Sequence, residues 1–66
     1  MIVSHTLSRN SLQQPVIHLL VKSDEDVAEV DYEVNRYLVD MDILSCQWIA
    51  QTPRDENGSV TMTYLI

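Results

Sequence analysis

Carboxylates are the most abundant groups in this chain that could do chemistry, and most of them are concentrated in one segment. Eight of the ten acidic residues lie between positions 24 and 42. They are Asp24, Glu25, Asp26, Glu29, Asp31, Glu33, Asp40 and Asp42. Carboxylates at this density could bind a cation, act as general acids and bases, or steer a basic partner. The structural element that carries them decides which role is open to them.

The apolar residues of the same segment have the spacing of a helix. They are Val27, Val30, Val34, Tyr37, Leu38 and Met41. Such spacing forms the buried stripe of an amphipathic helix. We predict a helix over residues 24–40 with Ser23 as its N-cap. Most carboxylates would then lie on its exposed face, where acid–base catalysis is disfavoured because no desolvated cleft shifts their pKa values.

The remaining reactive groups form no motif for catalysis or metal binding. His5 and His18 are the only imidazoles, and Cys46 is the only thiol. Cys46 is predicted on the sheet face opposite His18, so we interpret it as a small buried apolar residue. Gly58 is the only glycine, which excludes a glycine-rich phosphate loop. We therefore expect no enzymatic activity, no cofactor and no metal site.

The charge balance argues against direct nucleic-acid binding. The net charge is −6, and the four basic residues are scattered along the chain. Phosphate recognition normally needs a clustered basic patch. No uninterrupted apolar run is long enough to cross a membrane, and no secretory signal is recognisable at the N-terminus. With a single cysteine, these features favour a cytoplasmic location.

Alternation of apolar residues predicts strands on both sides of the helix. We expect strands at residues 16–22, 43–52 and 59–66, and a further short strand at residues 2–7. Asn57-Gly58 is a strong hairpin signal between the last two strands. The predicted core faces are Ile17, Leu19 and Val21, then Leu44, Cys46, Trp48 and Ala50, then Val60, Met62, Tyr64 and Ile66. The opposite faces carry polar residues, including His18, Gln47 and Thr63.

These elements predict a single α+β domain over residues 1–66, with residues 1–14 forming an extra strand and loop. Its order is β-α-β-β, and one helix packs on a three- to four-stranded mixed sheet in a two-layer sandwich. The strands joined by the helix should run parallel, and the last strand lies between them if the unit is a split β-α-β. The second sheet face is either solvated or covered by a partner or a second copy.

A motif in the helix carries a resemblance to a known family. Residues 33–38 read Glu-Val-Asn-Arg-Tyr-Leu and are followed by Ile43 and by a terminal Tyr-Leu-Ile. In these residues the chain resembles the small sporulation-associated (Cse-type) proteins of bacteria and their phage relatives. The similarity covers about half of the chain, and residues 1–14 depart from the pattern. It implies a small bacterial or phage protein without enzymatic chemistry, and it assigns no functional residues.

Our first functional hypothesis is a non-enzymatic binding protein. It would regulate or inhibit a larger protein by covering a basic surface with the acidic helix. The expected contact residues are Asp31, Tyr32, Glu33, Arg36, Asp40 and Asp42. The carboxylates would steer the partner, and Tyr32 and Arg36 are residue types that anchor interfaces. Asp40 and Asp42 also lie near the negative end of the helix dipole, where a negative charge is unfavourable. Helix stability therefore does not explain their presence.

The alternative hypothesis is a homo-oligomer that sequesters a small anionic ligand, such as a signalling nucleotide. A chain of 66 residues is too small to enclose an ordinary ligand pocket and is marginally stable alone. The ligand site would therefore lie between subunits. Its expected residues are Arg9, His18, Gln47 and Arg54.

Overall fold

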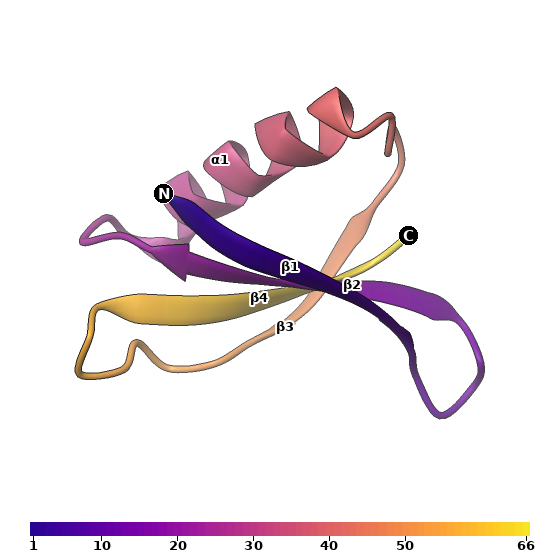
Figure 1. Cartoon of the computed structure of the whole chain (residues 1–66), viewed down its shortest axis with the longest axis horizontal. Coiled ribbons are helices and arrows are strands. Elements are labelled where there is room, and N and C mark those ends of the chain that lie inside the picture. Colours follow the sequence, from indigo (N-terminus) through magenta and orange to yellow (C-terminus); the bar gives the residue numbers. More distant parts are fainter.

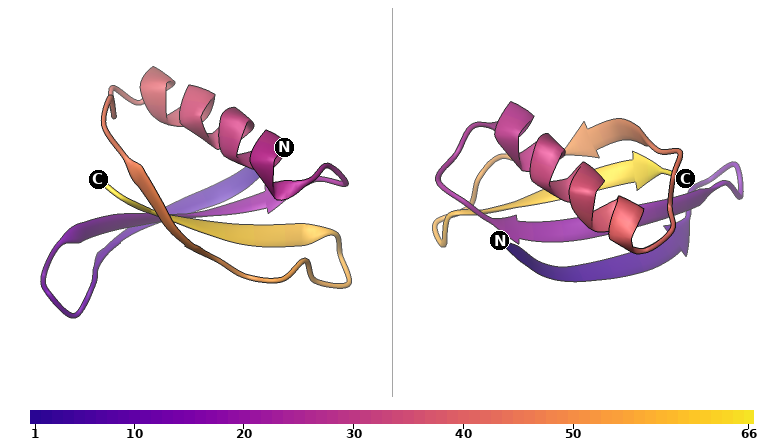
Figure 2. Two further views of the ribbon diagram at one scale, coloured as in Figure 1. Left: turned by 180° about the vertical axis from the view of Figure 1, so that it is seen from behind. Right: turned by 90° about the horizontal axis from the view of Figure 1, so that it is seen from above.

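The computed structural model describes all 66 residues and contains four strands and one helix (Figure 1). In chain order they are β1 (Ile2–Arg9), β2 (Pro15–Lys22), α1 (Val27–Asp40), β3 (Gln47–Gln51) and β4 (Ser59–Leu65). The helix covers one face of the sheet (Figure 2), so the predicted α+β fold is confirmed. The N-terminal strand is also present, and it extends two residues beyond the predicted end at position 7.

The strand order in the sheet is β1-β2-β4-β3, and every neighbouring pair is antiparallel. β2 and β3 therefore run parallel without touching, because β4 lies between them, as in a split β-α-β unit. The prediction of a mixed sheet was wrong in this respect. The helical connection does make β2 and β3 parallel, but insertion of β4 leaves no parallel hydrogen-bonded ladder.

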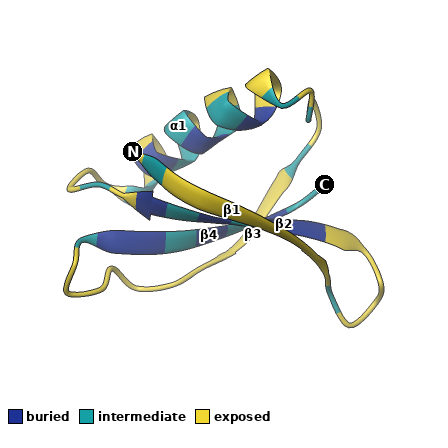
Figure 3. Ribbon diagram, in the orientation of Figure 1, coloured by how far each residue is buried: buried dark blue, intermediate teal, exposed yellow.

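The core lies between α1 and the two central strands. Nine buried side chains form it: Ile17, Leu19 and Val21 of β2, Val30, Val34 and Leu38 of α1, and Val60, Met62 and Tyr64 of β4. Figure 3 shows the same division, with buried central strands and exposed edge strands. The predicted core faces of the strands at 16–22 and 59–66 are confirmed, except that Ile66 is only partly buried.

The core face predicted for residues 43–52 was wrong. β3 spans only Gln47–Gln51, and all five of its residues are exposed. Leu44 precedes the strand and is 80% exposed, while Cys46 is partly buried. The register shifts between Trp48 and Ala50, which breaks the alternation on which the prediction depended. Because β3 is an edge strand, the helix does not cover it as it covers β2 and β4.

The helix begins later than predicted and has a different N-cap. Asp26 is the cap, and its carboxylate accepts a hydrogen bond from the Glu29 amide at 3.0 Å. The Ser23 hydroxyl instead accepts from the Glu25 amide at 3.0 Å, which closes a turn before the helix. The helix ends at Asp40 as predicted, and Asp42 then adopts a left-handed conformation with a φ of 63°. At 14 residues, and with a strongly acidic sequence, α1 has neither the length nor the apolar character of a membrane-crossing helix.

Candidate functional site

The carboxylates of α1 and of the turn before it have a cationic partner within the chain at one position only. The only ion pair joins the Met1 amino group to Glu33, at 3.1 Å. No lysine or arginine side chain lies within ion-pair distance of any carboxylate, and Arg36 is exposed without such a contact. Apart from Glu33, these carboxylates therefore keep their negative charge without an internal cationic partner.

Crowding of negative charge is visible at the start of the helix. The pKa of Glu25 is raised above its ordinary value, first because its side chain hydrogen-bonds to Glu29 and then because the Glu29 charge is close. The charges of Glu33 and Asp24 act in the same direction. A cationic group brought to this surface would relieve the repulsion.

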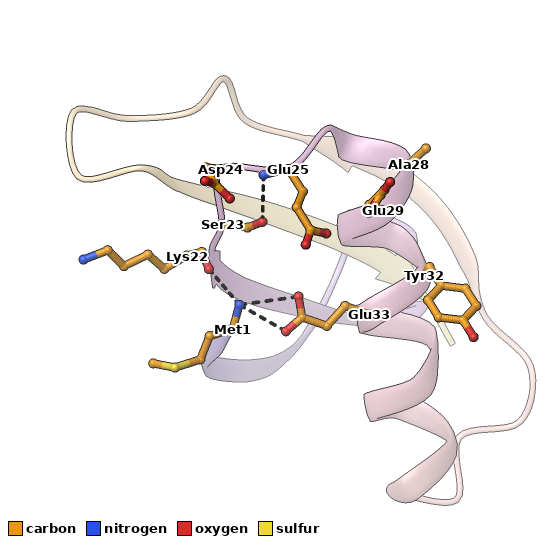
Figure 4. Close-up of a pocket in the computed structure, with 9 residues that line it drawn as sticks. All are labelled: Met1, Lys22, Ser23, Asp24, Glu25, Ala28, Glu29, Tyr32 and Glu33. Atoms are coloured by element: carbon orange, nitrogen blue, oxygen red, sulfur yellow. Dashed lines mark hydrogen bonds and ion pairs between the residues drawn. The ribbon is translucent and has the colours of Figure 1, made fainter.

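A groove of about 640 Å³ lies between the first turn of α1 and the ends of β1 and β2. Figure 4 shows the side chains of Glu25, Glu29 and Glu33 along it, with the Tyr32 ring at its outer limit. The Met1 amino group closes one side by donating to the Lys22 carbonyl oxygen at 2.7 Å. The Lys22 side chain extends away from these carboxylates, so the groove keeps its negative character (Figure 4).

Tyr32 is the most prominent aromatic side chain on the outer side of the helix. It is 67% exposed, and it borders the acidic groove and two smaller hollows of about 250 and 330 Å³. Arg36 and Asp40 line both smaller hollows, and Glu33 lines the larger of these two. The structure thus brings together four residues that the sequence predicted as contacts. Asp42 is exposed beyond the helix end and borders none of these hollows.

Asp31, also predicted as a contact residue, faces the sheet instead of the outer surface. Its carboxylate accepts hydrogen bonds from the Tyr64 hydroxyl and from the Asn35 side-chain amide, the latter at 3.0 Å. The side-chain oxygen Oδ1 of Asn35 in turn accepts a hydrogen bond from the Cys46 thiol at 3.4 Å. These four side chains form a continuous polar chain from the segment before β3, across α1, to β4.

The polar chain holds its two acidic hydrogen-bond donors in the protonated form. The pKa of Tyr64 is raised far above its ordinary value, mainly by burial and then by the hydrogen bond to Asp31. The pKa of the Cys46 thiol is also raised, by burial first and by the Asp31 charge second. A protonated thiol and phenol are poor nucleophiles, so this cluster joins the helix to the sheet and offers no activated group for catalysis.

A second polar chain crosses the sheet face that α1 leaves open. His18 Nε2 lies 3.1 Å from the Ser8 hydroxyl, and His18 Nδ1 lies 2.9 Å from the Thr63 hydroxyl. A hydroxyl bonded to an imidazole, which in turn bonds to a third group, is the arrangement that activates a nucleophile in many enzymes. Thr63, however, brings no negative charge to stabilise an imidazolium as the aspartate of a catalytic triad does. The contacts satisfy both ring nitrogens and tie β1, β2 and β4 together.

Three of the four residues predicted for a ligand site between subunits lie at the two ends of the sheet, whereas His18 lies inside β2. Arg9 pairs with Pro15 at one end, where Gln47 also lies opposite Leu65. Its guanidinium donates to the Gln13 carbonyl oxygen at 2.6 Å. Arg54 lies at the other end, beside Lys22, and donates to the Glu25 carbonyl oxygen. The length of β2 separates these ends by roughly 20 Å, so one chain does not assemble the set.

No three histidine, cysteine, aspartate or glutamate side chains converge in a way that could hold a metal ion. Comparison of the chain with family models, with curated proteins and with solved structures finds no match.

Proposed function

We propose that this chain is a small acidic binding protein that regulates or inhibits a larger protein by covering a basic surface. Binding would occur through the outer α1 surface, which we define as Glu29, Tyr32, Glu33, Arg36, Asp40 and Asp42. The observation that carries the proposal is that an exposed tyrosine stands among carboxylates that no lysine or arginine side chain of the chain neutralises.

Charge and anchoring would have separate roles in this interface. Unpaired carboxylates attract a basic partner over a distance comparable to the Debye length, about 10 Å at 0.1 M salt, and so raise the association rate. Tyr32 can bury a large ring between the hollows on either side of it, and Arg36 can add hydrogen bonds in a fixed geometry. Residence time would therefore depend on Tyr32, and the association rate on the carboxylates.

The origin and location of the protein extend the same proposal. Its helix motif and terminal residues are similar to those of the Cse-type proteins and their phage relatives, which supports a bacterial or phage origin. The single cysteine supports a location in the cytoplasm. The ligand-sequestering alternative has weaker support, because Arg9 and Arg54 lie at opposite ends of the sheet and each guanidinium already donates to a main-chain carbonyl oxygen of its own chain.

The test is selective retention of a protein from a bacterial extract at low salt. The immobilised chain is compared with its Glu29→Lys and Tyr32→Ala variants, and retained proteins are quantified by mass spectrometry. A basic protein should be retained by the parent chain and lost with both variants. Glu56→Lys is the matched control, since it makes the same charge change in the exposed hairpin between β3 and β4. Equal retention by Glu29→Lys and Glu56→Lys would mean that binding depends only on the net charge of the chain, and it would refute the proposed surface.

A further inference from the structure

The outer edge of β3 has no pairing partner in the chain. β3 is the last strand of the sheet, and it forms a ladder only with β4. All five of its residues are exposed. The main-chain groups that point away from β4 are therefore free to pair with a further strand.

The segment that includes this edge carries no charged side chain. Residues 43–53 include no acidic, basic or histidine side chain. Leu44, Trp48 and Ile49 are exposed large apolar side chains within this segment. Exposed large apolar side chains in an uncharged segment are typical of an interface.

The other free edge of the sheet has different surroundings. β1 is also an edge strand, but Ile2 shares a hollow with the charged residues Glu33, Arg36 and Asp40 of α1, two of which are carboxylates. Two copies that met at β1 would bring these carboxylates close to each other, and like charges repel. The chain has a net charge of −6, so self-association is least opposed where the carboxylates are absent. That condition is met along residues 43–53.

We propose that the β3 edge pairs with the same edge of a second copy to form a two-fold symmetric dimer with one continuous sheet. An interface between identical surfaces needs no complementary charge, and this edge has none. The proposal also explains the sequence of the strand. Leu44, Trp48 and Ile49 are large apolar residues that the isolated chain leaves exposed. A second copy paired at this edge would cover part of their surface.

The experiment is a measurement of molar mass by sedimentation and by light scattering over a concentration series. The parent chain should reach twice its 7.6 kDa mass. Ile49→Lys should weaken the dimer at least about tenfold, because it places an unpaired charge in the interface. Val3→Lys is the matched control. Val3 and Ile49 are both β-branched, and each lies at the register shift of an edge strand. Their exposed fractions are similar, 51% for Val3 and 45% for Ile49. It should leave the dimer mass unchanged.

Trp48 gives a second measurement that needs no variant. It is the only tryptophan of the chain and lies on β3. Its emission should shift to longer wavelength as the protein is diluted through the dimer dissociation constant. A single-chain mass at every concentration, or equal effects of Ile49→Lys and Val3→Lys on a folded protein, would overturn the proposal. Added salt should not weaken the dimer, whereas it should weaken the complex with a basic partner, so the two proposals fail separately.

Discussion

The Tyr64 hydroxyl donates a hydrogen bond to the Asp31 carboxylate, and this contact joins the last strand to the middle of the helix. The two residues are 33 positions apart in sequence. Tyr64 is buried in the core, and Asp31 is held in place by the Asn35 side chain one turn away. One carboxylate of an acidic segment is therefore part of the packing between helix and sheet.

We expect Tyr64→Phe to lower the free energy of unfolding by about 1.5 to 3 kcal/mol, the usual range for a hydrogen bond to a charged group. The ring still fills the core, so the loss is that of the hydroxyl contact. Urea denaturation at neutral pH measures it. Tyr32→Phe is the control, because that hydroxyl is exposed, and a change beyond about 0.5 kcal/mol there would be unexpected. Equal effects of the two variants would contradict the role of Asp31.

Stability should decline in alkaline solution because of Tyr64. Its pKa in the folded protein is raised by burial and by Asp31, so the folded state binds the phenolic proton more tightly than the unfolded state. The contribution is complete below the ordinary tyrosine value of about 10 and is lost as the pH rises above it. Urea denaturation from about pH 8 to pH 11 should show this decline. In Tyr64→Phe the free energy of unfolding should decline less steeply with pH. An unchanged slope would mean that other titrating groups cause the decline.

Removal of the true helix cap should cost more than removal of the hydroxyl that sequence patterns favour. Asp26→Ala should destabilise the protein by about 1 kcal/mol, because the Glu29 amide loses its side-chain acceptor. Ser23→Ala should change stability by less than about 0.5 kcal/mol, since its contact lies in the preceding turn. Thermal denaturation followed by circular dichroism compares them. Asp26→Asn should restore most of the loss, and a larger effect at Ser23 would place the cap there instead.

Truncation of the core stripe should have the largest effect on stability. Leu38 is fully buried between α1 and the sheet, and Leu38→Ala should cost roughly 2 to 5 kcal/mol through lost burial and a cavity. Leu12→Ala makes the same change in the exposed turn between β1 and β2 and should be nearly neutral. Chemical denaturation distinguishes the two. A cost below about 1 kcal/mol at Leu38 would mean that the helix is not packed as described.

Cys46 should react slowly with thiol reagents in the folded protein. Its pKa is raised by burial and by Asp31, so the reactive thiolate is scarcer than in an exposed cysteine. The rate of disulfide exchange with an aromatic disulfide at mildly alkaline pH should be several-fold lower than in urea. Asp31→Asn should raise the native rate by removing a negative charge. Equal rates in the native and the unfolded chain would show that the thiol is freely exposed.

Sequence patterns predicted the parts of the fold that depend on periodicity. The helical spacing of Val30, Val34 and Leu38 and the alternation of Ile17, Leu19 and Val21 gave the core correctly, because each side chain position follows from the geometry of its own element. The exposed positions of Tyr32 and Arg36 followed from the same helical spacing. The start of the helix was misjudged, because Ser23 and Asp26 are both favourable caps and only tertiary contacts decide between them.

Contacts between elements were not predictable in the same way. Asp31 has the same local pattern as its acidic neighbours, but β4 places the Tyr64 hydroxyl beside it alone. The one sequence signal for this contact was the spacing of Asp31 and Asn35, because side chains four residues apart on a helix can hydrogen-bond to each other. His18 and Thr63 were both predicted on the open face, yet their contact depends on the pairing of β2 with β4.

The sequence by itself determined the α+β class, the order of the elements, the apolar stripe of the helix and the concentration of negative charge along it. These follow from local spacing and composition, which act over a few residues. The tertiary structure decided that Asp31 turns inward, that β4 separates β2 from β3, and that β3 is an exposed, irregular edge. Strand order and register depend on which distant segments pair, and that choice is a property of the whole packed chain.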